Sequence, residues 1–479
     1  MSYAKRTLFG VMWSYLSFLG SKGINLAALI VLARLLGPSE FGLMAICTVV
    51  IAYFEIVAKF GLGAALVSAQ DNQDEMEAAV CIMSLLSSAA MALAAGIASP
   101  FIAGLFNEPS LVWPLRVIAL AMVVDAAAVV PSTLLSKRLQ FKKKAIPDIV
   151  KALIKGAVSI ALAYKGNGVW ALVLGHVIGT AAASVVSFVI NPWWPRVMPH
   201  RSVVAQAFRF GRHLLLAEII NSAQRNLDAL LVGKLLGPTL LGIYTLAFRL
   251  PDLVIRSFNQ VTGTVLHPVI SAMGVDRAAM QTAYLTSLRY VALVTFPAGV
   301  AICIASDAIV RLLYTPEWYG MTVPMQYLSI SLALLTVDFV PGILYKAMNR
   351  TEFLLWTSIL KLPLFVAVLI FAAPWGVAAI SAAQIGLSLA YMIPNGLILK
   401  RILGIGLWPT VEALRPAVLV SLVVTLVGLA LLRLPVIAAW AQVTVLGLGL
   451  GMTWGIGLAM AAPEVQIRIR SKLKRRKGA

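Results

Sequence analysis

Long apolar stretches alternate with short polar connections along the whole chain. A helix needs about 20 mostly apolar residues to cross the hydrocarbon core of a membrane, and the chain divides into about fourteen such stretches bounded by glycine, proline or charged residues. The pattern predicts an all-α polytopic membrane protein. The expected spans are 10–33, 41–67, 77–105, 110–136, 145–164, 168–190, 207–232, 241–271, 281–305, 322–346, 353–373, 376–399, 411–432 and 436–460.

Composition agrees with this pattern. Of 479 residues, 60% are apolar and 12% are charged, whereas soluble domains have about 25% charged residues. The mean hydropathy is +0.91. The net charge of +20 could suggest nucleic-acid binding, but Lys and Arg occur in short clusters between apolar runs, which disfavours it. Cys47, Cys81 and Cys303 lie in apolar runs without metal-ligand spacing, so no metal or cofactor is expected.

The distribution of basic residues predicts the orientation of the spans. If the N-terminus is cytoplasmic, the inside connections contain Lys5, Arg6, the run 136–144, residues 196–212 and the basic tail after Pro463. The outside connections hold little beyond Arg34, Lys165, Lys234 and Arg433. Because cytoplasmic loops carry an excess of Lys and Arg, both termini are expected inside, in a bacterial inner membrane. Trp113, Trp318 and other tryptophans at span ends are expected at the membrane interfaces.

An internal repeat organises the predicted spans. VLARLLGPSEFGLMAI follows the first span and LVGKLLGPTLLGIYTL follows the seventh, with Gly37 and Gly237 offset by 237 − 37 = 200. Gly42 and Gly242 keep this register. Repeats of the same orientation are typical of alternating-access transporters. The expected domains are a six-helix lobe at 1–200, a second at 201–402, two further helices at 403–463 and a basic cytoplasmic tail at 464–479.

Charged residues inside the spans are the candidate functional groups. An ionised side chain at mid-membrane costs about 2.5–3.5 kcal/mol on insertion scales, so it needs a partner or a watery cavity. Helical spacing places two sets on single stripes, one in the seventh span and one in the eighth. The first set is Glu218, Asn221, Arg225 and Asp228, and the second is Arg249, Asp252 and Arg256. In the first repeat, Lys22, Asn25, Glu55 and Lys59 occupy comparable places.

Guanidinium groups fit phosphate geometry, so the arginines favour a phosphorylated ligand. The candidate substrate-binding residues are Lys22, Asn25, Lys59, Arg225, Arg249 and Arg256. The candidate coupling-ion residues are Asp125, Glu218, Asp228 and Asp252. Structural alternatives stay open: Glu55 and Lys59 could neutralise each other, Lys151 could extend to the membrane surface, and Asp125, Asp338 and Lys361 could form buried pairs.

The element LARLLGPSEFG and the segment FRLPDLVIRSF (248–258), together with the 6 + 6 + 2 arrangement, resemble the multidrug/oligosaccharidyl-lipid/polysaccharide (MOP) exporter superfamily. Within it the chain is most similar to the Wzx-type polysaccharide transporters. The resemblance implies a flippase that exports undecaprenyl-pyrophosphate-linked repeat units for exopolysaccharide or O-antigen synthesis. It also implies membrane lipids and polysaccharide polymerase machinery as partners. Arg249 matches the arginine of the FRLP element, whereas Ala28 and Leu29 differ from the charged pair of the lipid II flippase MurJ.

Two alternative functions remain at this level. A multidrug or organic-cation antiporter of the same superfamily would normally have twelve helices and acid-dominated sites. A polysaccharide ligase or polymerase would normally need a large extramembrane loop, and no connection here is that long. The four histidines are scattered, so no catalytic residues are expected and the chain is not expected to be an enzyme.

The charge distribution makes a testable prediction about topology. Cysteine labelling of intact cells should find positions near 140, 205 and 475 cytoplasmic and positions near 108 and 318 periplasmic, because Lys and Arg are concentrated in the former connections. Labelling of position 140 from outside would contradict the orientation.

Overall fold

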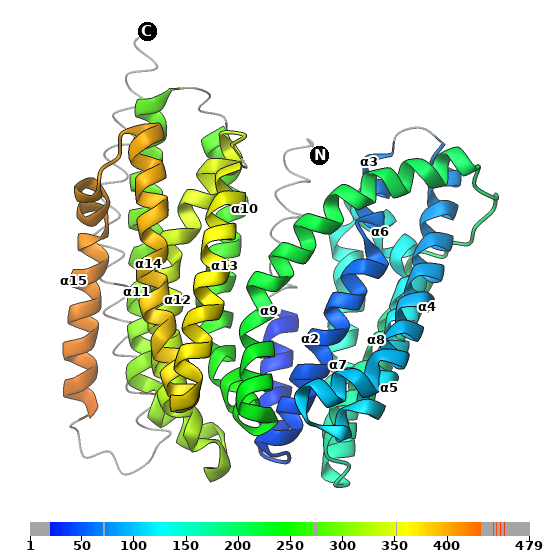
Figure 1. Cartoon of the computed structure of the whole chain (residues 1–479), viewed down its shortest axis with the longest axis horizontal. Coiled ribbons are helices and arrows are strands. Elements are labelled where there is room, and N and C mark those ends of the chain that lie inside the picture. Colours follow the sequence, from blue (N-terminus) through cyan, green and yellow to red (C-terminus); the bar gives the residue numbers. More distant parts are fainter. Residues whose placement is uncertain are drawn as a thin grey trace. The chain divides into compact units, whose positions relative to one another are not determined.

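The computed structural model describes residues 20–69, 72–271, 276–350 and 352–432, and the isolated positions 444, 447, 451 and 455. Nearly all of these residues are helical (Figure 1). Within the described ranges, nine helical segments are long and apolar enough to cross a membrane. The chain is therefore a multi-pass helical membrane protein. The start of the first expected span and nearly all of the last, 436–460, lie outside the described residues.

Contacts divide the chain into two compact units, Met1–Thr245 and Leu246–Ala479. The first unit begins with the helical stretch Gly20–Ala33. Its other elements are α2 (Pro38–Lys59), α3 (Leu62–Ser68), α4 (Gln73–Phe106), η1 (Pro109–Leu111), α5 (Val112–Ala127), α6 (Val129–Lys137), α7 (Phe141–Tyr164), α8 (Val169–Ile190) and most of α9 (Arg201–Pro251). Gly237, with φ 83° and ψ 174°, separates α9 into two helical segments.

The second unit contains the remaining elements. They are η2 (Asp252–Arg256), α10 (Ser257–Ser271), α11 (Arg277–Leu313), η3 (Pro316–Met321), α12 (Thr322–Ala347), α13 (Glu352–Ala372), η4 (Ala373–Trp375), α14 (Gly376–Leu403) and α15 (Leu407–Leu432). A core cluster of α11, α12 and α14 includes the fully buried Leu288, Val340 and Tyr345. Helices α11, α12, α14 and α15 are drawn side by side in Figure 1.

Three expected spans are less regular than the sequence suggested. The span expected at 41–67 breaks at Phe60 and Gly61, because Gly61 takes a left-handed conformation with φ 74° that ends α2 before α3 begins. The span expected at 110–136 breaks at Ala128 into α5 and α6. The eighth span contains the π-helical turn Asp252–Arg256. Apolar length predicts that a segment crosses a membrane but does not report such local breaks.

Similar backbone features recur about two hundred residues apart. Leu139, after α6, and Asn349, after α12, both have φ 56°, and their offset is 349 − 139 = 210. Gly168 and Gly376 both have positive φ at the starts of α8 and α14, with an offset of 376 − 168 = 208. The two units therefore repeat turn conformations at corresponding places in the chain.

The two Gly-Pro elements pack against each other inside the first unit. A Cβ atom on Gly42 would lie 1.8 Å from the Pro238 carbonyl oxygen, and one on Gly242 would lie 1.9 Å from the Pro38 carbonyl oxygen. The contact is reciprocal, because each glycine admits the proline carbonyl of the other element. Only glycine allows the two backbones to approach this closely.

This crossing predicts that Gly42→Ala and Gly242→Ala are strongly destabilising. The added methyl group would overlap a backbone oxygen, so the helices must separate, at a cost of about 1–3 kcal/mol. Thermal unfolding of the purified protein measures the effect. Gly386→Ala is the matched control, because a Cβ there meets nothing within 4 Å and a helical Gly→Ala change is normally favourable. Equal melting temperatures for Gly42→Ala and Gly386→Ala would contradict the tight crossing.

Candidate functional site

A cavity of about 180 Å³ lies within the first unit, between α2, α5, α7 and α8. Five ionisable residues line it: Glu55, Lys59, Asp125, Lys151 and His176. Thr48 and Thr180 add hydroxyl groups to the lining, and the rest is apolar. The cavity is thus a polar site enclosed by one lobe of a membrane protein.

Lys59 is the centre of the charges in this cavity. Its Nζ atom lies 2.7 Å from Asp125 Oδ2 and 3.2 Å from Glu55 Oε2. The i,i+4 pairing of Lys59 with Glu55, one of the alternatives from the sequence, is confirmed. The ion pair with another helix that the sequence allowed for Asp125 is also present, and its partner is Lys59. A single cation therefore holds two carboxylates from α2 and α5, and the side chains are still about one-third exposed.

The ion pair lies where two helices lose their regularity. Lys59 is the last residue of α2, and Asp125 lies three residues before the break at Ala128. Two serines of α4 donate hydrogen bonds to carbonyls at these breaks: Ser87 Oγ to Ala58 O at 2.6 Å and Ser84 Oγ to Ala126 O at 3.4 Å. Carbonyls released by the breaks therefore find partners on α4, as buried backbone groups require.

His176 and Lys151 complete the cavity. Nδ1 of His176 is buried without a hydrogen-bond partner among the described residues. Lys151 lines the cavity, so its side chain does more than extend to the membrane surface. Asp125 and His176 lie 51 residues apart (176 − 125), with the whole of α6 and α7 between them, so no pattern within one helix relates them.

The stripe of the seventh span forms pairs within the first unit. Arg225 Nη2 lies 2.7 Å from Glu218 Oε1, and both side chains are about half exposed. Asp228 accepts a hydrogen bond of 2.7 Å from the Tyr244 hydroxyl. The sequence also allows ion pairs of these arginines with Asp228 or Asp252, and in the structure Arg225 pairs with Glu218.

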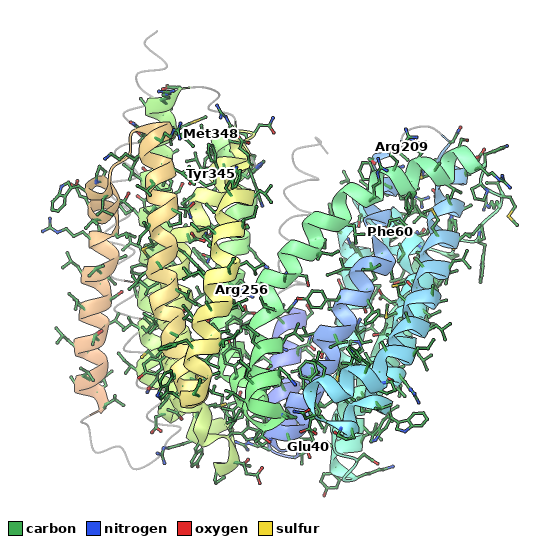
Figure 2. The ribbon with its side chains drawn as sticks, viewed as in Figure 1. Glu40, Phe60, Arg209, Arg256, Tyr345 and Met348 are labelled. Atoms are coloured by element: carbon green, nitrogen blue, oxygen red, sulfur yellow. The ribbon has the colours of Figure 1, made fainter. Side chains whose placement is uncertain are left out.

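The stripe of the eighth span belongs to the second unit. Arg256 Nε lies 3.0 Å from Asp252 Oδ1, across the π-helical turn, and its guanidinium lies 5.1 Å from the centre of the Phe248 ring. Arg249 has an exposed side chain, and no ion pair of Arg249 occurs among the described residues. Arg256, labelled in Figure 2, is held in place by its contacts with Asp252 and the Phe248 ring.

Of the remaining candidates, Lys22 and Asn25 are both exposed on the first helix, and Asn25 Nδ2 donates to Ser21 O at 2.8 Å. The candidates are thus distributed over both units. Lys22, Asn25, Lys59 and Arg225 lie in the first, and Arg249 and Arg256 lie in the second.

A second charged network lies in the second unit, joining α12, α13 and α14. Lys361 Nζ is 2.6 Å from both carboxylate oxygens of Asp338, and each side chain is 16% exposed. Asn395 Nδ2 also donates to Asp338, and the Tyr345 hydroxyl donates to Asn395 Oδ1 at 3.0 Å. The ammonium group lies 5.2 Å from the Tyr391 ring centre. The buried-pair alternative for Asp338 and Lys361 is confirmed.

Each helix of this network carries a proline close to its polar residue. Pro341 follows Asp338 by three residues, Pro363 follows Lys361 by two, and Pro394 directly precedes Asn395. A proline inside a helix removes one backbone hydrogen bond and kinks the helix. Charged pairs and helix irregularities therefore coincide in both units.

The tryptophan expectation needs one correction. Trp113, Trp194, Trp375 and Trp408 are strongly exposed, as interfacial residues should be, but Trp318 is 0% exposed. Its ring packs against Tyr314, with centroids 6.3 Å apart. Trp318 is a core residue of the second unit, so the expected place of Trp318 at a membrane interface is wrong.

The described residues contain no group of three or more His, Cys, Asp or Glu side chains arranged to hold a metal ion. The site chemistry that is present consists of ion pairs, hydroxyl groups and arginines. Such groups can bind charged ligands such as phosphates and carboxylates.

Comparison with known proteins identifies the family to which this chain belongs. The chain matches the family described as "Polysaccharide biosynthesis protein" over residues 31–323. This is more than half of its length, so the chain belongs to that family. The resemblance to Wzx-type transporters expected from the sequence is confirmed.

Individual relatives agree with this assignment. The lipopolysaccharide biosynthesis protein WzxC of Escherichia coli (strain K12) is 23% identical over 395 residues, which cover 82% of this chain and 79% of that protein. The succinoglycan biosynthesis transport protein ExoT of Rhizobium meliloti (strain 1021) is 24% identical over 360 residues, covering 75% and 72%. The lipid II flippase MurJ in an inward closed conformation has the same fold, with a TM-score of 0.75 at 13% identity over 95% of this chain and 99% of MurJ.

The buried pair of the second unit generates a stability prediction. Asp338→Asn or Lys361→Met alone should destabilise the protein by about 3–5 kcal/mol, because each leaves an unpaired buried charge. The double variant should recover most of this loss, since no charge then remains. Thermal unfolding of the four proteins measures the coupling.

The exposed pair Arg311 and Asp307 is the matched control, with side chains 57% and 55% exposed. Asp307→Asn should cost less than about 1 kcal/mol, because water screens an exposed pair. Equal effects at Asp307 and Asp338 would refute the structural role of the buried pair.

Proposed function

We propose that this protein is a flippase that moves lipid-linked oligosaccharides, carried on a polyprenyl pyrophosphate, from the cytoplasmic to the outer leaflet of a bacterial inner membrane. The family and the relatives named for lipopolysaccharide biosynthesis and succinoglycan transport support this function. The observation that carries it chemically is the exposed Arg249, which has no ion pair among the described residues, whereas Arg225 and Arg256 each contact an acid. An arginine of this kind suits a phosphorylated ligand.

The proposed architecture is two parallel six-helix repeats followed by two helices, with about fourteen spans in all. Lobes at 1–200 and 201–402 fit the recurring turns at Leu139 and Asn349 and the reciprocal packing of the Gly-Pro elements. In this arrangement the two lobes would expose a cavity alternately to either side of the membrane. Both termini would be cytoplasmic.

The proposed substrate ligands are the six cationic and amide residues Lys22, Asn25, Lys59, Arg225, Arg249 and Arg256. Four of these side chains are exposed: Lys22, Asn25, Arg225 and Arg249. A pyrophosphate could displace the carboxylate from Arg225 or Arg256, because phosphate oxygens accept from the same guanidinium donors. Arg249 would bind without displacing any acid.

The proposed coupling residues are Asp125, Glu218, Asp228 and Asp252. Three of them contact a cation and Asp228 accepts from a tyrosine hydroxyl. If substrate phosphates take over a cation, the released carboxylate becomes free to bind a proton or a metal cation. Substrate and ion binding would then be coupled through shared partners.

The partners in this proposal are the lipid-linked substrate, the surrounding lipids and the machinery that polymerises the exported units. The protein itself would form and break no covalent bond. An antiporter for organic cations remains the second candidate of the superfamily, and a ligase or polymerase is the candidate from another class. Glycan analysis of a deletion strain separates a flippase from a polymerase. Loss of a flippase leaves complete lipid-linked units on the cytoplasmic side, whereas loss of a polymerase leaves single units exported.

The proposal predicts that Arg249→Ala lowers export about ten- to hundredfold, because a charge-assisted hydrogen bond contributes about 1.5–3 kcal/mol. The amount of protein in the membrane should be unchanged, since removal of an exposed charge does not disturb packing. Arg249→Lys should keep part of the activity, because the charge remains and the bidentate fork is lost. Export in a complemented deletion strain and immunoblotting of membranes measure the two quantities.

Arg401→Ala removes an exposed arginine near the end of α14 and is the control, with export expected to be normal. Arg225→Ala and the double variant Arg225→Ala/Glu218→Gln separate binding from structure. If the double variant restores export, Arg225 only balances Glu218. Normal export in both Arg249→Ala and Arg225→Ala would remove these arginines from the substrate site.

A further inference from the structure

The connection between α8 and α9 and the first turns of α9 form a continuous basic segment. Residues 191–212 contain four arginines and no aspartate or glutamate. The arginines are Arg196, Arg201, Arg209 and Arg212, and all four are exposed. Charge of one sign over such a segment indicates a partner of the opposite sign.

The segment is held firmly against the first unit. Val203 and Ala207 are buried in a cluster with Leu62 of α3 and Leu134 of α6. A Cβ on Gly211 would lie 2.2 Å from the Phe60 carbonyl oxygen, so α9 contacts the break between α2 and α3 at close range. In Figure 2, Phe60 lies beneath this part of α9 and Arg209 lies on its outer side.

Two carboxylates of α4 fix the connection that precedes α9. Glu77 Oε2 accepts a 2.5 Å hydrogen bond from Trp193 Nε1. Glu75 Oε2 accepts from the His200 backbone at 3.1 Å and lies 2.9 Å from His200 Nδ1. These acids bind the connection itself, and none of the four arginines is in an ion pair within the described ranges.

The outer face of the helix is basic and partly apolar. At 3.6 residues per turn, Arg201, Arg212 and Arg209 project within about 80° of one another, away from Val203 and Ala207. Phe208 lies beside them and is 54% exposed. In the preceding connection, Trp194 and Met198 are 74% and 84% exposed. Arginine beside exposed aromatic and apolar groups is typical of a helix that lies in a membrane interface.

The length of α9 places this face outside the hydrocarbon core. Residues 201–236 form one continuous helix before Gly237. At 1.5 Å per residue this is about 54 Å, whereas the hydrocarbon core is about 30 Å thick. About 20 residues suffice to cross this core, so a span that ends at Gly237 uses only the later part of this helix. The first turns, with Arg201, Arg209 and Arg212, therefore extend beyond the core.

We propose that Arg201, Arg209 and Arg212, with Phe208, form a docking surface for the headgroups of anionic phospholipids in the leaflet that faces the start of α9. Phosphate groups complement the three guanidinium groups, and the phenyl ring reaches the boundary of the acyl chains. Gly211 and Ala207 pack the same helix against the end of α2 and against α3. Binding of the arginines to the leaflet therefore fixes one end of the first unit at the membrane surface. This surface is separate from Arg225, which lies 13 residues (225 − 212) after Arg212 on the same helix.

The experiment measures the position of this face in a lipid bilayer. A polarity-sensitive fluorophore is attached to Ala205→Cys, which lies between Arg201 and Arg209 on the exposed side, after replacement of Cys47, Cys81 and Cys303 by alanine. The full-length protein is studied in nanodiscs of phosphatidylcholine alone and of phosphatidylcholine with phosphatidylglycerol. We expect blue-shifted emission and quenching by headgroup-labelled lipid only with phosphatidylglycerol, reversed by high salt.

The variant Arg201→Gln/Arg209→Gln/Arg212→Gln should lose this response while keeping its melting temperature, because the three side chains are exposed. Each arginine near an anionic surface shifts binding by roughly fivefold, so the three together shift it by about a hundredfold. Replacement of all three by lysine should preserve most of the response. The matched control Lys142→Gln/Lys143→Gln/Lys400→Gln removes the same charge from other exposed positions and should behave as the unmodified protein.

Two outcomes would overturn the inference. A fluorophore that stays in water in both lipids shows that the face does not reach the bilayer. An equal loss of the response in the control Lys142→Gln/Lys143→Gln/Lys400→Gln shows that only the total charge matters. The readout does not depend on export, so a failure of the proposed transport function leaves it intact, and normal docking with no export would count against the transport proposal alone.

Discussion

A charged side chain inside a membrane needs a partner or a watery cavity, and ion pairs meet this constraint in both units of the protein. Lys59 holds Asp125 and Glu55 in the first, and Lys361 holds Asp338 in the second. Without a partner each group would cost several kcal/mol in hydrocarbon. The pairs therefore connect helices that apolar packing alone would leave free to rotate or slide, since lipid chains and apolar side chains contact each other equally well.

These pairs lie at the irregular parts of the helices. The Lys59 pair adjoins the breaks at Gly61 and Ala128, and the Lys361 network adjoins Pro341, Pro363 and Pro394. Helices bend most readily where backbone hydrogen bonds are already missing. A transporter that alternates between two states needs both bending points and interactions that fix each state. Ion pairs at the bends place the bending points and the interactions that fix each state in one location. The same pairs are sensitive to any ligand that competes for their cations.

The proposed substrate is a competitor of this kind. A pyrophosphate group offers oxygens to the same guanidinium donors that now contact Glu218 and Asp252. Arg249 differs from these residues because its side chain is exposed without an ion pair among the described residues. The basic face at the start of α9 shows the same chemistry outside the hydrocarbon core, where the anionic groups available are those of the lipid surface. In the two proposals, Arg225 and Arg249 serve the transported ligand, and the arginines in the first turns of α9 serve the surrounding membrane.

The sequence by itself determined the class of the protein, because the apolar length of the spans, the charge clusters and the Gly-Pro motif are each contained in a short stretch of the chain. It indicated that Lys59 could pair with Glu55, because four residues make one helical turn. Only the tertiary structure decided that Asp125 shares Lys59, that Asn395 and Tyr345 support Asp338, and that Trp318 is buried. The partners in these three contacts are far apart in the sequence: 66 residues for Lys59 and Asp125, 57 for Asp338 and Asn395, and 50 for Tyr345 and Asn395. Their meeting depends on how each helix is rotated about its axis and packed against its neighbours, which periodicity within one helix does not specify.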